Sequence, residues 1–299
     1  MNVSCFQRFL VAIHIILACV CASAHEASAV IEIPFDFYRN EIILQVKING
    51  KGPFNMMLDT GTDPSGIDLA TAKELGLKLV PLGKPATGGG TDVNPTYGTE
   101  LSLVEVGGLT AKDLEAIAIS LSKISDRLGK PLHGVLGHGL LHGRIVQIDY
   151  PNRVVRFYSA SPISKGPTRT VMPFRYKDNV LIDDVSINGK KVVGNLDTGS
   201  NGGFSLTPEA VSLLGLEEEV SRAKVTTDVG YNGVSENREG KLNNVTVGGI
   251  SVDAPVATFF GKRTGHDNKP WGINIGNVFL KDFILTIDYR KKLVMLEKP

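Results

Sequence analysis

The feature of this sequence that most constrains its fold is an internal duplication. The stretch "VKINGKGPFNMMLDTG" (46–61) aligns with "VSINGKKVVGNLDTG" (185–199), and "GVLGHGLLHGRIVQIDYPNRVVRF" (134–157) aligns with "INIGNVFLKDFILTIDYRKKLVML" (273–296). The interval between equivalent residues is nearly constant, 138 positions at the end of the first pair and 139 throughout the second. This interval is far longer than a solenoid repeat, so the sequence predicts two similar lobes.

The lobes are expected over residues 30–160 and 171–299. Between them lies a segment rich in Ser, Pro and Gly, which predicts a linker over 161–170. The chain has 299 residues, of which 42% are hydrophobic and 21% charged, so each half is long enough to bury a core of its own.

The signals inside each half are mainly those of β-strands. "EIILQVKI" and "NVLIDDVSI" alternate apolar and polar residues and end in Asn-Gly, the sequence of a tight hairpin turn. One short helix per lobe is predicted, at "DLATAKELGL" (68–77) and "TPEAVSLLGL" (207–216). The predicted fold class is therefore all-β, with two similar lobes.

Residues 1–29 have the composition of a secretory signal peptide. One positive charge precedes an apolar stretch of about 14 residues, which is too short to span a bilayer comfortably. Small residues then predict cleavage after Ala24 or Ala29. A retained anchor and a lipoprotein attached through Cys19 are alternatives. All three cysteines lie in this segment, so we expect an exported, disulfide-free protein, periplasmic or secreted and of bacterial type.

The charge of the chain argues against nucleic acid and anionic membranes as partners. Formal net charge is +1, and the sequence has no long basic or acidic run.

The order of motifs in each half resembles the retropepsin-like unit of aspartic peptidases. Asp-Thr-Gly follows an apolar strand, then come a helix ending in "LGL", "VGG", and an apolar-apolar-Gly turn before "IDY". Two such units in one chain resemble the bilobal, pepsin-like members. The resemblance implies a central cleft where the two Asp-Thr-Gly loops meet, completed within a single chain, so we expect a monomer.

Asp59 and Asp197 are the predicted catalytic residues. Two carboxyl groups in contact cannot both ionise cheaply, so they share one proton. One carboxyl group then acts as base and the other as acid, which is the known chemistry of aspartic proteases. The expected activity is that of an aspartic endopeptidase acting on peptides or proteins. The alternative is a bilobal peptide-binding protein of the cell envelope that has lost catalysis.

The remaining residues of the two loops are expected to support this pair. The glycines, Gly61 and Gly199, let the backbones approach closely, and by resemblance Thr60 and Thr198 cross-bond the loops beneath the aspartates. The hydroxyls of Thr62 and Ser200 favour ionised carboxyl groups and so an acidic working range.

A glycine-rich segment resembles the flap that covers the cleft in these enzymes. Gly88, Gly89 and Gly90 permit a tight, mobile hairpin tip, and Tyr97 is the nearest aromatic residue. An ordinary exposed loop is the alternative for this segment.

No metal and no cofactor are expected. A water molecule held by two carboxyl groups requires neither. Three histidines, His133, His138 and His142, are close in sequence, but no helix places all three on one face.

Overall fold

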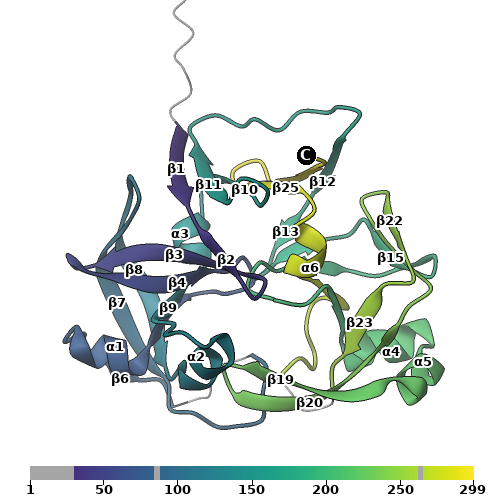
Figure 1. Cartoon of the computed structure of the whole chain (residues 1–299), viewed down its shortest axis with the longest axis horizontal. Coiled ribbons are helices and arrows are strands. Elements are labelled where there is room, and N and C mark those ends of the chain that lie inside the picture. The colour runs from purple at the N-terminus through teal and green to yellow at the C-terminus, as the bar shows by residue number, and fades with distance from the viewer. Residues whose placement is uncertain (1–29, 84–87, 262–264) are drawn as a thin grey trace, which may run out of the picture.

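The structure is a computed structural model that describes residues 30–83, 88–261 and 265–299. The predicted signal peptide lies outside the described residues. Within them, no helix is long and apolar enough to cross a membrane. The fold is mainly β and consists of two lobes joined by a shared sheet (Figure 1). The predicted fold class is confirmed.

The N-terminal lobe is built on an eight-stranded sheet of order β2-β3-β4-β9-β5-β8-β7-β6, in which β3 also pairs with β7. Its strands are β2 (Asp36–Tyr38), β3 (Glu41–Ile48), β4 (Lys51–Leu58), β5 (Ser65–Asp68), β6 (Val80–Pro81), β7 (Tyr97–Val106), β8 (Leu109–Ile119) and β9 (Gly134–Leu136).

The C-terminal lobe repeats this arrangement in a second eight-stranded sheet, of order β13-β14-β17-β24-β18-β23-β20-β19, with a four-stranded sheet of order β16-β15-β21-β22 beside it. Its strands are β13 (Arg175–Tyr176), β14 (Val180–Ile182), β15 (Val185–Ile187), β16 (Lys190–Lys191), β17 (Gly194–Leu196), β18 (Phe204–Leu206), β19 (Lys224–Gly230), β20 (Gly233–Lys241), β21 (Asn244–Val247), β22 (Ile250–Asp253), β23 (Val256–Phe259) and β24 (Ile273–Ile275).

A six-stranded sheet of order β1-β11-β10-β25-β26-β12 joins the lobes. The two lobes meet where β10 pairs antiparallel with β25, with Gln147 opposite Thr286. The "IDY" motif at the end of each repeat therefore forms the junction. The strands of this six-stranded sheet are β1 (Val30–Pro34), β10 (Ile145–Asp149), β11 (Val154–Tyr158), β12 (Arg169–Pro173), β25 (Ile284–Asp288) and β26 (Leu293–Glu297).

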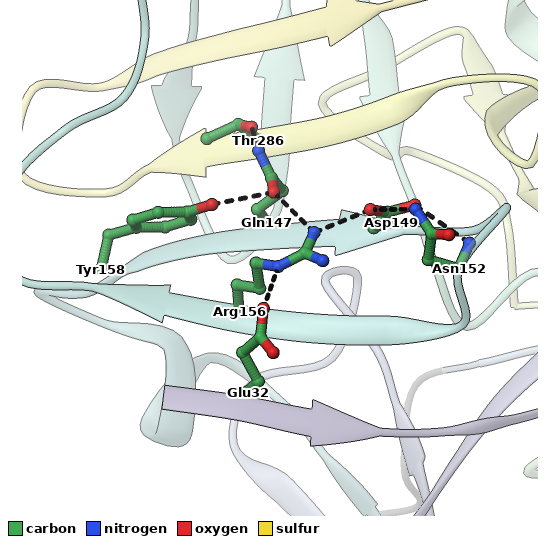
Figure 2. Close-up of polar contacts among 7 residues, drawn as sticks. All are labelled: Glu32, Gln147, Asp149, Asn152, Arg156, Tyr158 and Thr286. Carbon is green, nitrogen blue, oxygen red and sulfur yellow. Dashed lines mark hydrogen bonds and ion pairs between the residues drawn. The ribbon is translucent and has the colours of Figure 1, made fainter. Parts of the chain in front are cut away.

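A polar network covers part of this junction (Figure 2). Arg156 is its centre and donates to Glu32 at 2.6 Å and to Asp149 at 2.7 Å, while Gln147 bonds Thr286 of the other lobe at 3.1 Å. Burial raises the pKa of Asp149, but the hydrogen bonds from Arg156 and from the adjacent turn outweigh it, so this pKa lies below its ordinary value. The network therefore links the two lobes through ionised and amide groups.

Each lobe has three short helices in its described residues, two more than expected. The predicted helices form, capped as their sequences indicate: Asp68 accepts from Ala70 and Thr71, and Thr207 accepts from Ala210. The additional helices are only four to seven residues long, too short for a clear apolar period. The helices are α1 (Leu69–Glu74), α2 (Ser122–Leu128), α3 (His138–Leu141), α4 (Pro208–Leu214), α5 (Glu217–Arg222) and α6 (Asn277–Leu280).

The hairpin β19–β20 extends from the C-terminal lobe along the edge opposite the six-stranded sheet. Figure 1 shows it reaching α2 of the N-terminal lobe, with which β19 is in contact. This crossing covers the space between the lobes on the side away from the junction.

Candidate active site

The two Asp-Thr-Gly loops are held by matching backbone bonds at the inner ends of β4 and β17. The amide of Asp59 donates to the Leu136 carbonyl at 3.0 Å, and the amide of Asp197 donates to the Ile275 carbonyl at 3.0 Å. Each acceptor is the last residue of the neighbouring parallel strand, β9 or β24. The duplicated sequence therefore presents two aspartates in equivalent positions.

Thr60 and Thr198 cross-bond the loops in a nearly symmetric way. Each threonine hydroxyl accepts the other's backbone N–H at 3.1 Å. Each also donates to a carbonyl of the opposite lobe, that of Leu196 at 2.7 Å and that of Leu58 at 2.9 Å. Both threonines are buried, so these bonds are shielded from water and fix the distance between the loops.

The loops approach so closely that only glycine fits after each threonine. A Cβ at Gly61 would lie 2.8 Å from Asp197 Oδ1, and a Cβ at Gly199 would overlap the Asp59 carboxyl group. The two carboxyl groups are themselves in hydrogen-bonding contact. The predicted meeting of the two loops is thus a contact between carboxyl groups.

Asp59 accepts hydrogen bonds on both oxygens. The Gly61 N–H donates to Oδ1 at 2.7 Å, and the Thr62 hydroxyl donates to Oδ2 at 2.5 Å. The Tyr231 hydroxyl lies 3.2 Å from Thr62 Oγ1. Because Thr62 has one hydrogen and gives it to Asp59, Tyr231 is the donor in this second bond.

Asp197 has a different set of donors. The Gly199 N–H donates to Oδ1 at 2.9 Å, as in the first lobe, but the donor to Oδ2 is the amide of Asn274 at 2.8 Å. The hydroxyl of Ser200 makes no bond to this carboxyl group within the described part of the chain. The Asn274 amide is oriented in turn by Asn195, whose Nδ2 donates to Asn274 Oδ1 at 2.7 Å. An amide therefore stands where a hydroxyl was expected.

The environment raises the pKa of both aspartates. Burial raises the pKa of Asp59, against the hydrogen bonds from Thr62 and Gly61. Burial also raises the pKa of Asp197, and the negative charge of Asp59 raises it further. Burial of the pair therefore favours one shared proton over two ionised carboxyl groups.

The aspartates line a cavity of about 950 Å³ between the lobes. Apart from the loop residues 59–65 and Arg127, its N-terminal wall is apolar, whereas its C-terminal wall carries amide, hydroxyl and aromatic side chains. The residues on the first wall include Met57, Ile117, Ile119, Ile124, Leu132 and Val135; those on the second include Asn195, Ser205, Thr258, Phe260, His266, Trp271 and Asn274.

Two hairpin tips meet above the cavity. The Asn232 N–H donates to the Gly89 carbonyl at 2.9 Å, and the Asp92 N–H donates to the Asn232 carbonyl at 2.7 Å. Gly88 and Gly89 line the cavity, and Gly90 forms a bridge with Asn232. The glycine-rich segment thus lies over the aspartates, together with the hairpin β19–β20 of the other lobe.

The tyrosine near the aspartates is Tyr231, at the tip of β19–β20, and not Tyr97. Tyr97 lies on β7, paired with Ala118 and Pro81, and packs against the core. It is not among the residues that line the cavity. Sequence reasoning missed Tyr231; the signal was its place beside Asn-Gly in "VGYNGV", which is a turn sequence.

The three histidines of the first lobe do not share one site, although the ring centroids of His138 and His142 lie 5.0 Å apart. His133 Nδ1 accepts the Asn55 N–H at 3.0 Å, whereas His138 stacks on Tyr176 at 3.7 Å. Over the described ranges, no group of three or more His, Cys, Asp or Glu side chains is arranged to hold a metal ion.

The geometry agrees with a comparison of the sequence with known families. A family model described as aspartyl protease matches residues 44–140 and 184–273, more than half of the chain. The chain belongs to the aspartyl protease family. It matches none of the curated proteins.

The two matched segments are the two lobes of this aspartyl protease family member. Each contains one Asp-Thr-Gly loop and the strand that leads into it, β4 in the first and β17 in the second; the first also contains β9, whereas the second ends at the first residue of β24. The six-stranded sheet lies outside both matched segments, although four of its strands, β10, β11, β25 and β26, belong to the duplicated stretches 134–157 and 273–296.

Proposed function

We propose that this protein is an aspartic endopeptidase that hydrolyses peptide bonds with Asp59 and Asp197. The observation that carries the proposal is the contact between the two carboxyl groups, each with a backbone N–H donor on one oxygen and a side-chain donor on the other. A protein that only bound peptides would have no need for two buried carboxyl groups sharing one proton.

In the proposed reaction, Asp59 is ionised and Asp197 is protonated. Asp59 takes a proton from a water molecule whose oxygen attacks the scissile carbonyl carbon, while Asp197 gives its proton to the carbonyl oxygen. The tetrahedral intermediate then collapses: one of its hydroxyls returns a proton to Asp197 as the carbonyl re-forms, the carbon–nitrogen bond breaks, and the proton on Asp59 passes to the leaving nitrogen. The donors around each carboxyl group keep both in place during these transfers.

The two hairpin tips above the cavity are proposed to control substrate entry and to exclude water from the bound peptide. The bonds that Asn232 makes with Gly89 and Asp92 close the cavity on this side, and we expect them to open when a polypeptide enters. When these tips close over a bound peptide, they exclude bulk water and strengthen the electrostatic interactions beneath them.

The decisive experiment measures cleavage of a mixed synthetic peptide pool by mass spectrometry, from pH 3 to pH 8. The wild-type protein should cleave a subset of the peptides, and Asp59→Asn and Asp197→Asn should each lose at least about a thousandfold in rate. Asp126→Asn, which changes an exposed carboxylate on α2, is the matched control and should be fully active.

Two further measurements interpret the result. Circular dichroism should show all three variants folded, because neither dyad substitution removes a hydrogen bond between backbone groups. If the wild-type protein binds pool peptides but cleaves none at any pH, the protein is a binding protein and the proposal is overturned.

The protein is also proposed to act outside the cytoplasm. The support is residues 1–29, which have the composition of a signal peptide. Expression of the full chain in a bacterial host, followed by fractionation and N-terminal sequencing, tests this. A new N-terminus at His25 or Val30 in the periplasmic or extracellular fraction is expected, and retention of Met1 on cytoplasmic protein would contradict it.

A further inference from the structure

The two walls of the cavity are built from equivalent positions of the two lobes, yet they differ in chemistry. In the N-terminal lobe, strand pairing aligns Met57 with Val135, Val135 with Gly66, and Gly66 with Ile117. Directly paired residues lie on the same face of a sheet, and all four line the cavity. We call Met57, Gly66, Ile117 and Val135 the apolar row.

The C-terminal lobe has a row in the same register. Strand pairing aligns Asn195 with Asn274, Asn274 with Ser205, and Ser205 with Thr258. All four line the cavity as well. We call Asn195, Ser205, Thr258 and Asn274 the polar row. Every position of the apolar row is thus replaced by a side chain that can donate and accept hydrogen bonds.

The polar row is not explained by packing alone. Asn195 is 2% exposed, and its Oδ1 has no hydrogen-bond partner in the described part of the chain. The indole N–H of Trp271, also on this wall, is buried and lacks a partner within the same residues. A buried polar atom without a partner destabilises the protein, so a ligand that supplies the missing partner would bind preferentially.

The charges near the polar row do not favour an ionised ligand. Glu239 continues the row next to Thr258, and Lys269 also lines the cavity, so charges of both signs are present. His266 is neutral over most of the pH range, because burial lowers its pKa to about 4. The surroundings therefore suit an uncharged group that both donates and accepts.

We propose that the polar row is a specificity pocket for an uncharged hydrogen-bonding side chain of the substrate, an amide or a hydroxyl. The apolar row takes an apolar side chain on the other side of the scissile bond. The inference rests on the proposed endopeptidase function and specifies its substrate class: peptides with an apolar residue on one side of the cleaved bond and Gln, Asn, Ser or Thr on the other.

Cleavage-site mapping with the wild-type protein is the first test. In a pool with all residues equally represented, amide and hydroxyl side chains should be enriched about tenfold over apolar ones of similar size at one position flanking the cut. Apolar side chains should be enriched on the opposite side. Equal preference for apolar residues on both sides would overturn the inference.

The duplication provides matched variants. Ser205→Gly combined with Thr258→Ile copies two of the four positions of the apolar row, Gly66 and Ile117, into the C-terminal lobe without touching either aspartate or its donors. This variant should cleave the same pool but prefer apolar residues on both sides. The reciprocal control, Gly66→Ser with Ile117→Thr, should change the opposite side alone. Gly66 has room for a side chain, because an added Cβ would lie 3.7 Å from its nearest neighbour.

A binding measurement separates failure of this inference from failure of the proposed function. The Asp59→Asn protein is titrated calorimetrically with two peptides that differ only in Gln against Leu at the mapped position, or at each central position in turn if nothing is cleaved. About tenfold tighter binding of the Gln peptide by this protein is expected. Equal binding of the two peptides would overturn the proposed polar pocket even if the enzyme is active. Preferential binding of the Gln peptide without any cleavage would support the pocket but contradict the endopeptidase proposal.

Discussion

The side-chain amide of Asn274 donates a 2.8 Å hydrogen bond to the carboxyl group of Asp197. At the equivalent position of the N-terminal lobe stands Val135, which has no polar atom to offer. In that lobe the Thr62 hydroxyl donates to Oδ2 of Asp59 instead. The two halves of the dyad have thus diverged in the group that holds each carboxylate.

This difference predicts a change in pH dependence for Asn274→Val. A hydrogen bond to a charged group contributes about 1.5–3 kcal/mol, and 1.36 kcal/mol corresponds to one pKa unit. Loss of this donor should raise the pKa of the protonated member of the dyad and move the alkaline limb of kcat/KM upward by about 1–2 pH units. Profiles of one cleaved peptide measure this. The Val135→Ala control should leave the limb in place; an unmoved limb in Asn274→Val would contradict the prediction.

The bonds between the loops predict a stability effect for Thr60→Val. The substitution keeps the shape of the side chain but leaves the Thr198 N–H and the Leu196 carbonyl buried without a partner. At about 1–3 kcal/mol for each of the two lost partners, the free energy of unfolding should fall by about 2–6 kcal/mol. Urea unfolding followed by circular dichroism measures it. Thr60→Ser retains the hydroxyl and should lose less than about 1 kcal/mol; equal losses in the two variants would contradict the role of the hydroxyl.

Much of this architecture could be predicted from the sequence because it is encoded locally and twice. The repeated Asp-Thr-Gly loops, the caps at Asp68 and Thr207, and the lobes themselves all follow from short patterns. The fold class needed no long-range information beyond the match between the two halves.

The features that sequence reasoning missed depend on contacts between distant segments. Nothing local in "VGYNGV" indicates that Tyr231 lies beside Thr62, 169 positions away. Asn274 departs from the apolar-apolar-Gly pattern, with the sequence Asn-Ile-Gly in place of Val-Leu-Gly, and the reason is evident only when Asp197 is seen beside it. Such positions break a local rule where the site requires a polar group.

The bond between lobes predicts a modest catalytic role for Tyr231. Tyr231→Phe removes the donor to Thr62 but keeps the ring, so kcat/KM should fall about fivefold to tenfold, equivalent to about 1 kcal/mol, with little change in melting temperature. Tyr97→Phe is the matched control, since Tyr97 packs on β7 outside the cavity, and should retain wild-type activity. An unchanged kcat/KM in Tyr231→Phe, or an equal loss in the control, would refute this role.

Glu41 predicts that the protein loses stability as the pH rises towards 8. This side chain is fully buried at the start of β3; burial raises its pKa to about 8, although Arg127 donates to Oε1 at 2.8 Å and lowers it. A carboxyl group whose pKa is raised in the folded state contributes its full stabilisation of the fold below its ordinary pKa of about 4.3. This contribution disappears as the pH rises through about 8.

Melting temperatures measured from pH 4 to pH 9 should therefore fall less steeply in Glu41→Gln, which keeps an acceptor for Arg127 but cannot ionise. The control is Glu217→Gln, which changes an exposed carboxylate on α5 and should reproduce the wild-type slope. If Glu41→Gln shows the wild-type slope as well, Glu41 is ionised in the folded protein and the prediction is wrong.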